Sequence, residues 1–223
     1  MDKSKIIVIE GACDGIGKST QLELLTHKLK EDNVDFIHHH FPSYGTYQAI
    51  PVEKYLNGEY GSIEDNNPYF INNLYALDRA VTWYTSLKKE YENGKTIIFD
   101  RYTTSSIIYQ SALIEDIDDK KRFIDYIIDF EYNKLGIKKP DRVLFLTADF
   151  DLVNSIRLKR NLQDASSVNS DIHEKNINFI KKVYDNALFV ADYLHWDIIK
   201  CDDGNNMRSK EDISNDIYRL IMK

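Results

Sequence analysis

The sequence is poor in the features that mark several specialised classes of protein. It has two cysteines, Cys13 and Cys201, which are too few for a disulfide scaffold, so a reducing compartment is expected. No apolar run approaches the roughly 20 residues that a membrane-spanning helix needs. The net charge of −7 argues against a nucleic-acid-binding surface, which is usually basic, although it allows a local basic pocket. The sequence therefore predicts a cytoplasmic protein without a nucleic-acid or membrane partner.

What is present is an ordinary globular composition with alternating strands and helices. Of the 223 residues, 43% are hydrophobic and 29% are charged, as in a single soluble domain, which we expect to span residues 1–223. Short apolar runs predict five strands, at residues 6–10, 34–38, 96–100, 142–146 and 197–201. The opening MDKSKIIVIE is accordingly interpreted as a strand and not as a signal peptide. Helices are expected at residues 20–30 and 68–93, and loops at 42–68 and 161–170.

The stretch EGACDGIGKST ends like a phosphate-binding loop but is one residue longer than the usual pattern. That pattern has four residues between its first glycine and Gly-Lys-Ser/Thr, whereas five are present here. Unpaired N–H groups and the helix dipole favour a triphosphate at the start of the following helix. Lys18 is expected to reach the β- and γ-phosphates, and the Ser19 hydroxyl to complete a Mg²⁺ shell. Gly15 and Gly17 let the backbone turn towards the phosphates without a Cβ in the way.

The order of these elements predicts where ligands bind. Strands alternating with helices indicate a parallel sheet, and such sheets bind ligands beyond the carboxyl ends of their strands. The glycine loop follows the first strand and Asp100-Arg101 closes the third, so both are expected at one edge. We predict an α/β fold, a P-loop NTPase-type three-layer α/β/α sandwich. It has a five-stranded parallel sheet with helices on both faces and a short lid at about residues 158–172.

Two helical faces carry side chains suited to a nucleotide. Tyr75 and Arg79 are four residues apart, and a ring beside a guanidinium suits a base stacked near its own phosphate. The alternative is that Tyr75 is an aromatic residue of the core and that Asp78 forms a surface ion pair with a neighbour. A second face, which is expected to hydrogen-bond a pyrimidine edge, combines Ser106, Tyr109 and Gln110.

Asp100 and Arg101 stand at the binding edge of the predicted sheet. The carboxylate has the position of a second Mg²⁺ ligand, directly or through water. The arginine suits an acceptor phosphate, and a structural salt bridge is the alternative. The run His38-His39-His40 does not indicate a metal site, because adjacent strand residues point to opposite faces.

Taken in order, these segments resemble the thymidylate kinase family. The right half of the family's E-G-x-D-G-x-G-K-S-T-Q matches residues 14–21, so the additional residue falls at Ala12 or Cys13. The resemblance extends over nearly the whole chain. Further matches are Phe41-Pro42-Ser43-Tyr44-Gly45 to F-P-x-Y, residues 56–61 to L-x-G-E-x-G, residues 75–79 to F-A-L-D-R, residues 100–110 to D-R-Y-x-x-S-x-x-A-Y-Q, and residues 171–174 to D-x-x-E.

The resemblance implies a kinase that transfers the γ-phosphate of ATP to dTMP, giving dTDP and ADP for dTTP biosynthesis. It implies Mg²⁺ as cofactor and a homodimer that pairs through a long helix of the kind spanning residues 69–92. Implied ATP-phosphate ligands are Asp14, Gly15, Ile16, Gly17, Lys18, Ser19, Thr20 and Arg157. Implied dTMP ligands are Phe41, Pro42, Tyr44, Tyr75, Arg79, Arg101, Ser106, Tyr109 and Gln110. Implied catalytic residues are Lys18, Arg101, Arg160 and Asp14, and implied metal ligands are Ser19, Asp100 and Asp14.

The family supplies a further catalytic arginine from the phosphate loop or from the lid. Cys13 and Ile16 are not basic, so the lid must provide it here, and the candidates are Arg157 and Arg160, of which Arg160 is nearer the polar loop. Two other functions fit the sequence: a kinase for another (deoxy)nucleotide or deoxynucleoside, and a catalytically impaired P-loop nucleotide-binding regulator. Two arginines placed for an acceptor phosphate speak against a bare nucleoside.

Overall fold

Five strands form a parallel sheet in the computed structural model, which describes residues 5–63, 65–163 and 177–222, with the backbone alone for 160–163. The strand order is β2-β3-β1-β4-β5, and every neighbouring pair is parallel, which confirms the predicted fold class. The bounds are β1 Ile6–Gly11, β2 Phe36–His40, β3 Thr96–Asp100, β4 Arg142–Thr147 and β5 Asp197–Lys200.

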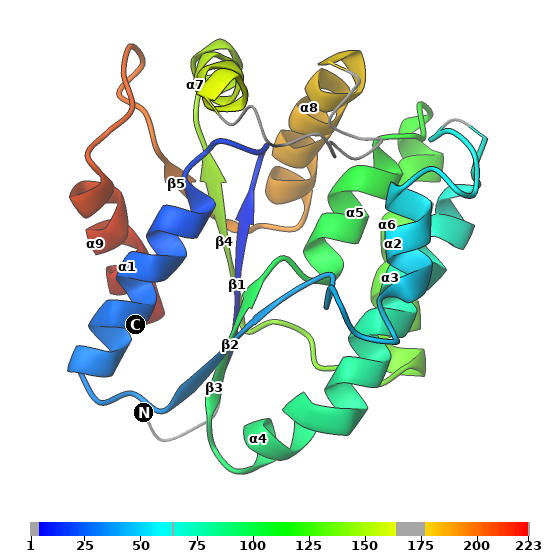
Figure 1. Ribbon diagram of the computed structural model, residues 1–223, viewed down its shortest axis with the longest axis horizontal. Helices are drawn as coiled ribbons and strands as arrows, with labels where there is room; N and C mark the ends of the chain where they lie inside the picture. The colour runs from blue at the N-terminus through cyan, green and yellow to red at the C-terminus, as the bar shows by residue number, and fades with distance from the viewer. Residues whose placement is uncertain (1–4, 64, 164–176, 223) are drawn as a thin grey trace.

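Helices cover both faces of this sheet (Figure 1). On one side lie α1 (Lys18–Glu31) and α9 (Lys210–Ile221). On the other side lie α2 (Ile50–Leu56), α3 (Pro68–Thr82), α5 (Thr103–Ser111) and α6 (Ile117–Ile128). Helix α7 (Phe150–Gln163) follows β4, and α8 (Ile177–Tyr193) packs against α5, where the amide of Asn186 donates to the carbonyl of Ile108 at 2.7 Å.

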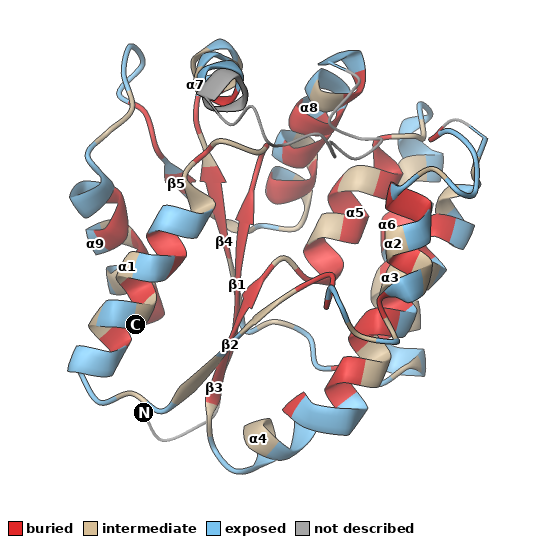
Figure 2. Ribbon diagram, viewed as in Figure 1, coloured by how far each residue is buried: buried red, intermediate tan, exposed pale blue. Residues whose placement is uncertain are grey.

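The central strands are buried on both faces, as Figure 2 shows. All residues of β1 and β3 are buried, which suits their continuous runs of β-branched and aromatic side chains. Alternate residues belong to different clusters: Ile7 packs in the cluster that includes Leu25 of α1, and Val8 in the one that includes Trp83. Burial therefore fixes the carboxyl ends of β1 and β3 side by side, where the site is built.

The predicted helix at residues 68–93 has the expected extent but is not uniformly α-helical. It begins at Pro68, where the Asn67 side chain accepts a hydrogen bond from the N–H of Tyr69 at 2.8 Å. The segment η1 (Trp83–Leu87) is a π-helix, and α4 (Lys88–Glu92) completes the run. A second π segment, η2 (Asp129–Lys134), follows α6 directly.

Other sequence boundaries need correction. The second strand lies two residues later than expected, because it pairs with β3 in a register that places His40 opposite Asp100. The expected loop at 42–68 contains α2, whose first turn accommodates Pro51 because first-turn N–H groups have no intrahelical partner anyway. Helix α7 covers residues 161–163 of the predicted polar loop, and the remainder of that loop lies outside the described residues.

Candidate active site

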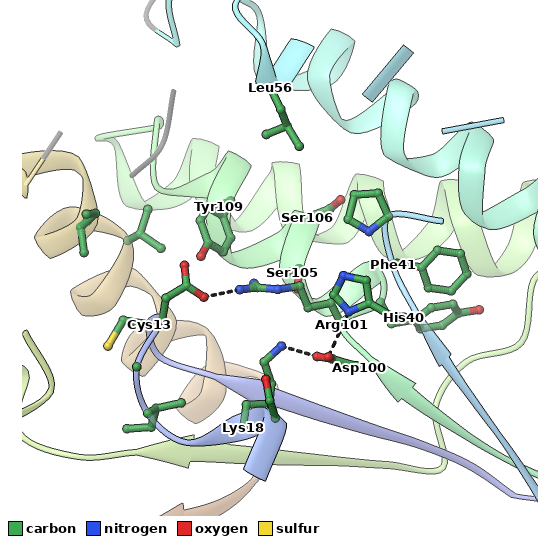
Figure 3. A pocket seen from close by; sticks show the side chains of 18 of the residues that line it. Cys13, Lys18, His40, Phe41, Leu56, Asp100, Arg101, Ser105, Ser106 and Tyr109 are labelled. Atoms are coloured by element: carbon green, nitrogen blue, oxygen red, sulfur yellow. Dashed lines mark hydrogen bonds and ion pairs between the residues drawn. The ribbon is translucent and has the colours of Figure 1, made fainter. Parts of the chain in front are cut away.

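A cavity of about 600 Å³ opens at the carboxyl edge of the sheet. Its size is that of a small-molecule site. It is lined by every predicted catalytic, ATP, dTMP and metal residue except the catalytic candidate Arg160, whose side chain lies outside the described part of the chain. The structure thus brings these residues together, while their individual roles stay predictions. Figure 3 shows the cavity from close by.

The additional residue of the phosphate loop lengthens the approach to the loop, that is, the segment between strand β1 and Asp14. Strand β1 runs through Gly11, and the N–H of Ala12 still donates to the carbonyl of Leu146 in β4 at 3.0 Å. A Cβ on Gly11 would lie 2.8 Å from Cγ2 of Ile16, so this glycine makes room for the loop to fold back. Gly11 therefore belongs to the strand and is not among the residues that line the cavity.

The helix start beyond this loop is suited to an anion. Gly17 precedes α1 with φ 92°, a left-handed conformation that favours glycine, and Gly15 has the same φ. No described side chain caps the first N–H groups of α1. These donors and the helix dipole therefore face the cavity without a protein acceptor, as a phosphate site requires.

Asp100 is held on both carboxylate oxygens. Its Oδ1 contacts Lys18 Nζ, and its Oδ2 lies 3.0 Å from Nδ1 of His40 (Figure 3). Burial alone would raise the pKa of Asp100, but the hydrogen bond from His40 and the charge of Lys18 hold it well below its usual range. The carboxylate is therefore ionised and rigidly placed beside the phosphate loop.

Arg101 is the cation between the two ends of the cavity. Its backbone is left-handed, with φ 63°, which turns the chain sharply as it leaves β3. The guanidinium donates to Oδ1 of Asp14 at 2.7 Å, lies 3.9 Å from Oε1 of Glu10 and stacks 5.6 Å from the ring centre of Tyr109. The salt bridge considered for Arg101 is thus present, and it lies in the cavity wall.

Arg79 has a different environment, since it is only 2% exposed. Its Nε and Nη2 donate to the two carboxylate oxygens of Glu131 at 2.7 and 2.6 Å, and Nη2 also donates to Ser106 Oγ at 2.9 Å. Burial alone would lower the pKa of Arg79, but Glu131 raises it, so the arginine stays charged. The alternative of a surface ion pair at Asp78 is wrong, because that carboxylate is buried and accepts the N–H of Ser43 at 2.8 Å.

The far end of the cavity is aromatic, with a few polar groups. Phe41 packs against Phe99 with ring centres 5.5 Å apart, and Tyr75 meets Tyr55 edge to face at 6.3 Å. The buried Oε1 of Gln110 has no hydrogen-bond partner among the described residues, so it is available to an N–H of a ligand. These features suit a flat heterocycle with a polar edge.

Arg157 packs against the phosphate loop from α7. A Cβ on Gly15 would lie 3.4 Å from Cβ of Arg157, so the two backbones approach closely. The guanidinium donates to Oδ1 of Asn154 at 3.0 Å, and its buried Nε has no partner in the described part of the structure. Of the two lid candidates, Arg157 thus lines the cavity.

Three residues of this site were missed as functional residues at the sequence level. Glu10 accepts hydrogen bonds from the hydroxyls of Thr104 and Ser105 at 2.9 and 2.5 Å, and it precedes the loop glycine directly. His40 could have been found from the strand alternation once β2 was placed correctly. Glu131 carries no sequence signal, because it meets its partner across 52 residues from within a π segment.

The donor groups fit a magnesium ion. Ser19, Asp14 and Asp100 bring one hydroxyl and two carboxylates to the wall beside the phosphate loop. Mg²⁺ prefers such hard oxygen ligands and is usually held by one or two carboxylates together with substrate phosphates. The described residues contain no group of three or more His, Cys, Asp or Glu that could hold a metal by themselves, which agrees with that mode of binding.

Sheet, loop and cavity together define a class. A parallel sheet whose first strand leads through a glycine loop into a helix beginning Lys-Ser is a P-loop nucleotide-binding fold. None of the described helices has the length and apolar character needed to cross a bilayer.

Comparisons with known proteins give the family. The model of the thymidylate kinase family matches residues 9–215. A thymidylate kinase of Plasmodium falciparum is 29% identical, covering 99% of this chain and 91% of its own. A probable thymidylate kinase of Thermococcus onnurineus is 31% identical, covering 96% of both chains. The solved thymidylate kinase of Candida albicans shares the fold, with a TM-score of 0.69 at 22% identity, over 99% of this chain and 92% of its own. The chain belongs to the thymidylate kinase family, which confirms the resemblance.

Proposed function

We propose that this protein transfers the γ-phosphate of ATP to dTMP, giving dTDP and ADP, with Mg²⁺ as cofactor. Family membership and the curated relatives support this reaction. The observation that carries it is a single cavity with a phosphate loop at one end, an aromatic and amide-lined wall at the other, and Arg101 between them. No observation favours another acceptor or a non-catalytic regulator.

At the donor end, the chain binds and orients the triphosphate. The N–H groups at the start of α1 and the Lys18 ammonium surround the β- and γ-phosphates. Lys18 is paired with Asp100, so a phosphate that binds Lys18 has to replace that carboxylate as its partner. When bound, Mg²⁺ would neutralise charge on the phosphates, held by Ser19 and by Asp100 or Asp14.

At the acceptor end, the chain positions dTMP for in-line attack. Arg101 lies where an acceptor phosphate would meet the donor, and its Asp14 partner is 39% exposed, so it can exchange that carboxylate for phosphate. Tyr75 and Phe41 offer faces to the base, while Arg79, Ser106 and Gln110 offer polar atoms to its edge. Phosphoryl transfer needs this positioning and charge stabilisation more than covalent chemistry from the protein.

The position of Arg157 supports a role in closing the donor end. It lines the cavity against Gly15, directly before the residues predicted as the lid. A cation there would stabilise charge on the transferring group while closure excludes water. Arg160 stays the other candidate for this role.

A panel of steady-state assays tests the proposal. Candidate acceptors are dTMP, dUMP, dCMP, dGMP and thymidine, each with saturating ATP and Mg²⁺. We expect dTMP to have the highest kcat/KM and thymidine to give no product. Absence of dTMP turnover alongside good turnover of another acceptor would contradict the substrate assignment.

We also propose a homodimer that pairs through the α3–η1 helix. Phe70, Leu77 and Tyr84 recur every seven residues on this helix and are 43%, 49% and 56% exposed. Seven residues are close to two helical turns, so the three side chains form one apolar strip. Light scattering at micromolar concentration should give twice the chain mass, and Leu77→Lys should give the monomer mass. A cytoplasmic location is part of the same proposal, supported by the two free cysteines.

A further inference from the structure

His40 links the two ends of the cavity. It is the last residue of β2 and lies directly opposite Asp100 in the register of β2 with β3. Its Nδ1 is 3.0 Å from Oδ2 of Asp100, while its ring stacks on Tyr44, with centres 6.1 Å apart and planes 24° apart. One imidazole therefore contacts both a carboxylate of the donor end and an aromatic of the acceptor wall.

The contact with His40 accounts for one of the two oxygens of the Asp100 carboxylate. Because a carboxylate only accepts, the His40 Nδ1–H is the donor. It occupies Oδ2 and leaves Oδ1 towards Lys18 and the phosphate loop. The β2–β3 backbone ladder places both residues, and the N–H of Phe41 adds a bond to the carbonyl of Asp100 at 3.1 Å. The histidine is thus anchored independently of the carboxylate that it orients.

The neighbouring histidines have other environments. His39 points away from this site and lies 3.0 Å from the Ser43 hydroxyl. His38 lines a smaller cavity of about 210 Å³ whose wall also includes Ser19, Glu23 and Asp100. The part of the chain that the structure describes has no metal-binding cluster at these histidines. The partner of His40 at the donor end is the carboxylate.

We propose that His40 is a positioning residue for phosphoryl transfer, which holds the Asp100 carboxylate in the orientation that the donor phosphates and their Mg²⁺ require. The proposal rests on the proposed kinase function. His40 acts through Asp100, whereas its stacking on Tyr44 concerns only the acceptor wall. The two contacts can be separated by substitution, because one needs a donor atom and the other needs a flat ring.

A matched pair of variants separates them. His40→Phe keeps a ring against Tyr44 but removes the donor to Asp100. His40→Asn removes the ring but places an amide N–H close to the position of Nδ1. His40→Leu removes the donor and the ring together, and it replaces His40→Phe in the kcat and magnesium measurements if phenylalanine disturbs the fold. Melting temperatures without ligand identify variants that are merely unstable.

The kinetic readout is whether each substitution changes kcat or the KM for dTMP. We expect His40→Phe to lower kcat roughly 10-fold to 100-fold, as for residues that orient a metal-binding group, with the KM for dTMP nearly unchanged. We expect His40→Asn to keep kcat within about threefold and to raise the KM for dTMP several-fold, since a ring contact is lost.

A second readout does not depend on turnover. The melting temperature is measured with ADP alone and with ADP plus Mg²⁺, and the difference is the magnesium increment. We expect the wild type and His40→Asn to show the full increment and His40→Phe a clearly smaller one. This arm remains informative if dTMP proves not to be the acceptor, so failure of the proposed function and failure of this inference can be told apart.

Two results would overturn the role of His40. One is a His40→Phe protein with wild-type kcat and an unchanged magnesium increment. The other is a His40→Asn protein impaired in kcat as strongly as His40→Phe, which would mean that ring shape matters and the hydrogen bond does not.

Discussion

Two arginines of the cavity wall are held in contrasting ways. At the acceptor end, Arg79 and Glu131 are 2% and 0% exposed and form a two-pronged ion pair. Between the two ends, Arg101 and Asp14 are 19% and 39% exposed and share a single short contact. Thr103 also donates to Glu131 at 2.9 Å, whereas the Asp14 carboxylate faces the open cavity.

The contrast shows which interactions ligands can replace. Separating a fully buried pair leaves an uncompensated charge without water, so Arg79 and Glu131 form a fixed part of the wall. A partly exposed pair is worth little, so Arg101 can exchange Asp14 for a phosphate at small loss. In this account the Arg79–Glu131 pair is in place before substrate arrives, and Arg101 stays paired with Asp14 until a phosphate takes over.

The largest effect is expected from removing the exchangeable cation. Arg101→Ala should lower kcat by roughly 10³-fold, because a charge that stabilises the transition state is lost from a dry site. The affinity for ATP, measured by calorimetry, should stay within about threefold, since Lys18 and the loop N–H groups remain. Arg101→Lys is the control that keeps the charge. A wild-type kcat in Arg101→Ala would refute the role assigned to this residue.

Breaking the fixed pair should act on folding as well as on activity. Glu131→Gln preserves shape but leaves Arg79 without its counter-charge, so the free energy of unfolding should fall by about 3 kcal/mol. Urea denaturation measures this loss. Asp14→Asn breaks the Arg101–Asp14 pair and is the matched control, for which we expect less than about 1 kcal/mol. Equal losses in the two variants would remove the contrast between the two pairs.

The acid response of the donor end should be smaller but specific. The folded-state pKa of Asp100 lies below its unfolded value, so its contribution is complete above about pH 4 and is lost as the pH falls through the folded pKa. Between about pH 6 and about pH 2.5, the ligand-free wild type should therefore lose more free energy of unfolding than Asp100→Asn. Parallel losses in the two proteins would mean that Lys18 and His40 do not stabilise this carboxylate.

The least effect is expected at the lengthened approach to the phosphate loop. Burial raises the pKa of Cys13 and of Cys201 to about 12, so both thiols stay protonated near pH 8. Iodoacetamide should therefore leave the native protein fully active over a period in which both cysteines of the unfolded chain react. Rapid inactivation would place a reactive thiolate at the donor end and contradict the passive role of this segment.

Much of the fold follows from the sequence because the burial of strands and helices requires apolar residues in recognisable patterns. Buried β-branched runs identified β1 and β3, and the carboxyl-edge rule placed the glycine loop beside Asp100-Arg101. Helix irregularities were not predicted: η1 and η2 interrupt or follow α-helical runs without a sequence pattern that marks them. The position of β2 likewise depended on pairing with β3, which no local pattern specifies.

The candidate site was predictable where motifs carry it and not where distant pairing does. The phosphate loop and the Asp100-Arg101 pair lie on continuous segments, and both line the cavity. The partners of these residues come from elsewhere: Glu131 reaches Arg79 from another helix, and His40 reaches Asp100 across the sheet. Such contacts need tertiary structure, because neither spacing nor composition encodes them.

The central claim is that both nucleotides occupy one cavity with their phosphates meeting between Lys18 and Arg101. Inhibition by a molecule that joins adenosine and thymidine at their 5′ oxygens through a chain of phosphates tests this claim most directly. The account predicts that this molecule competes with ATP and also with dTMP. Competition with only one of them, at saturating concentrations of the other, would show that the two nucleotides bind at separate places and would contradict the account.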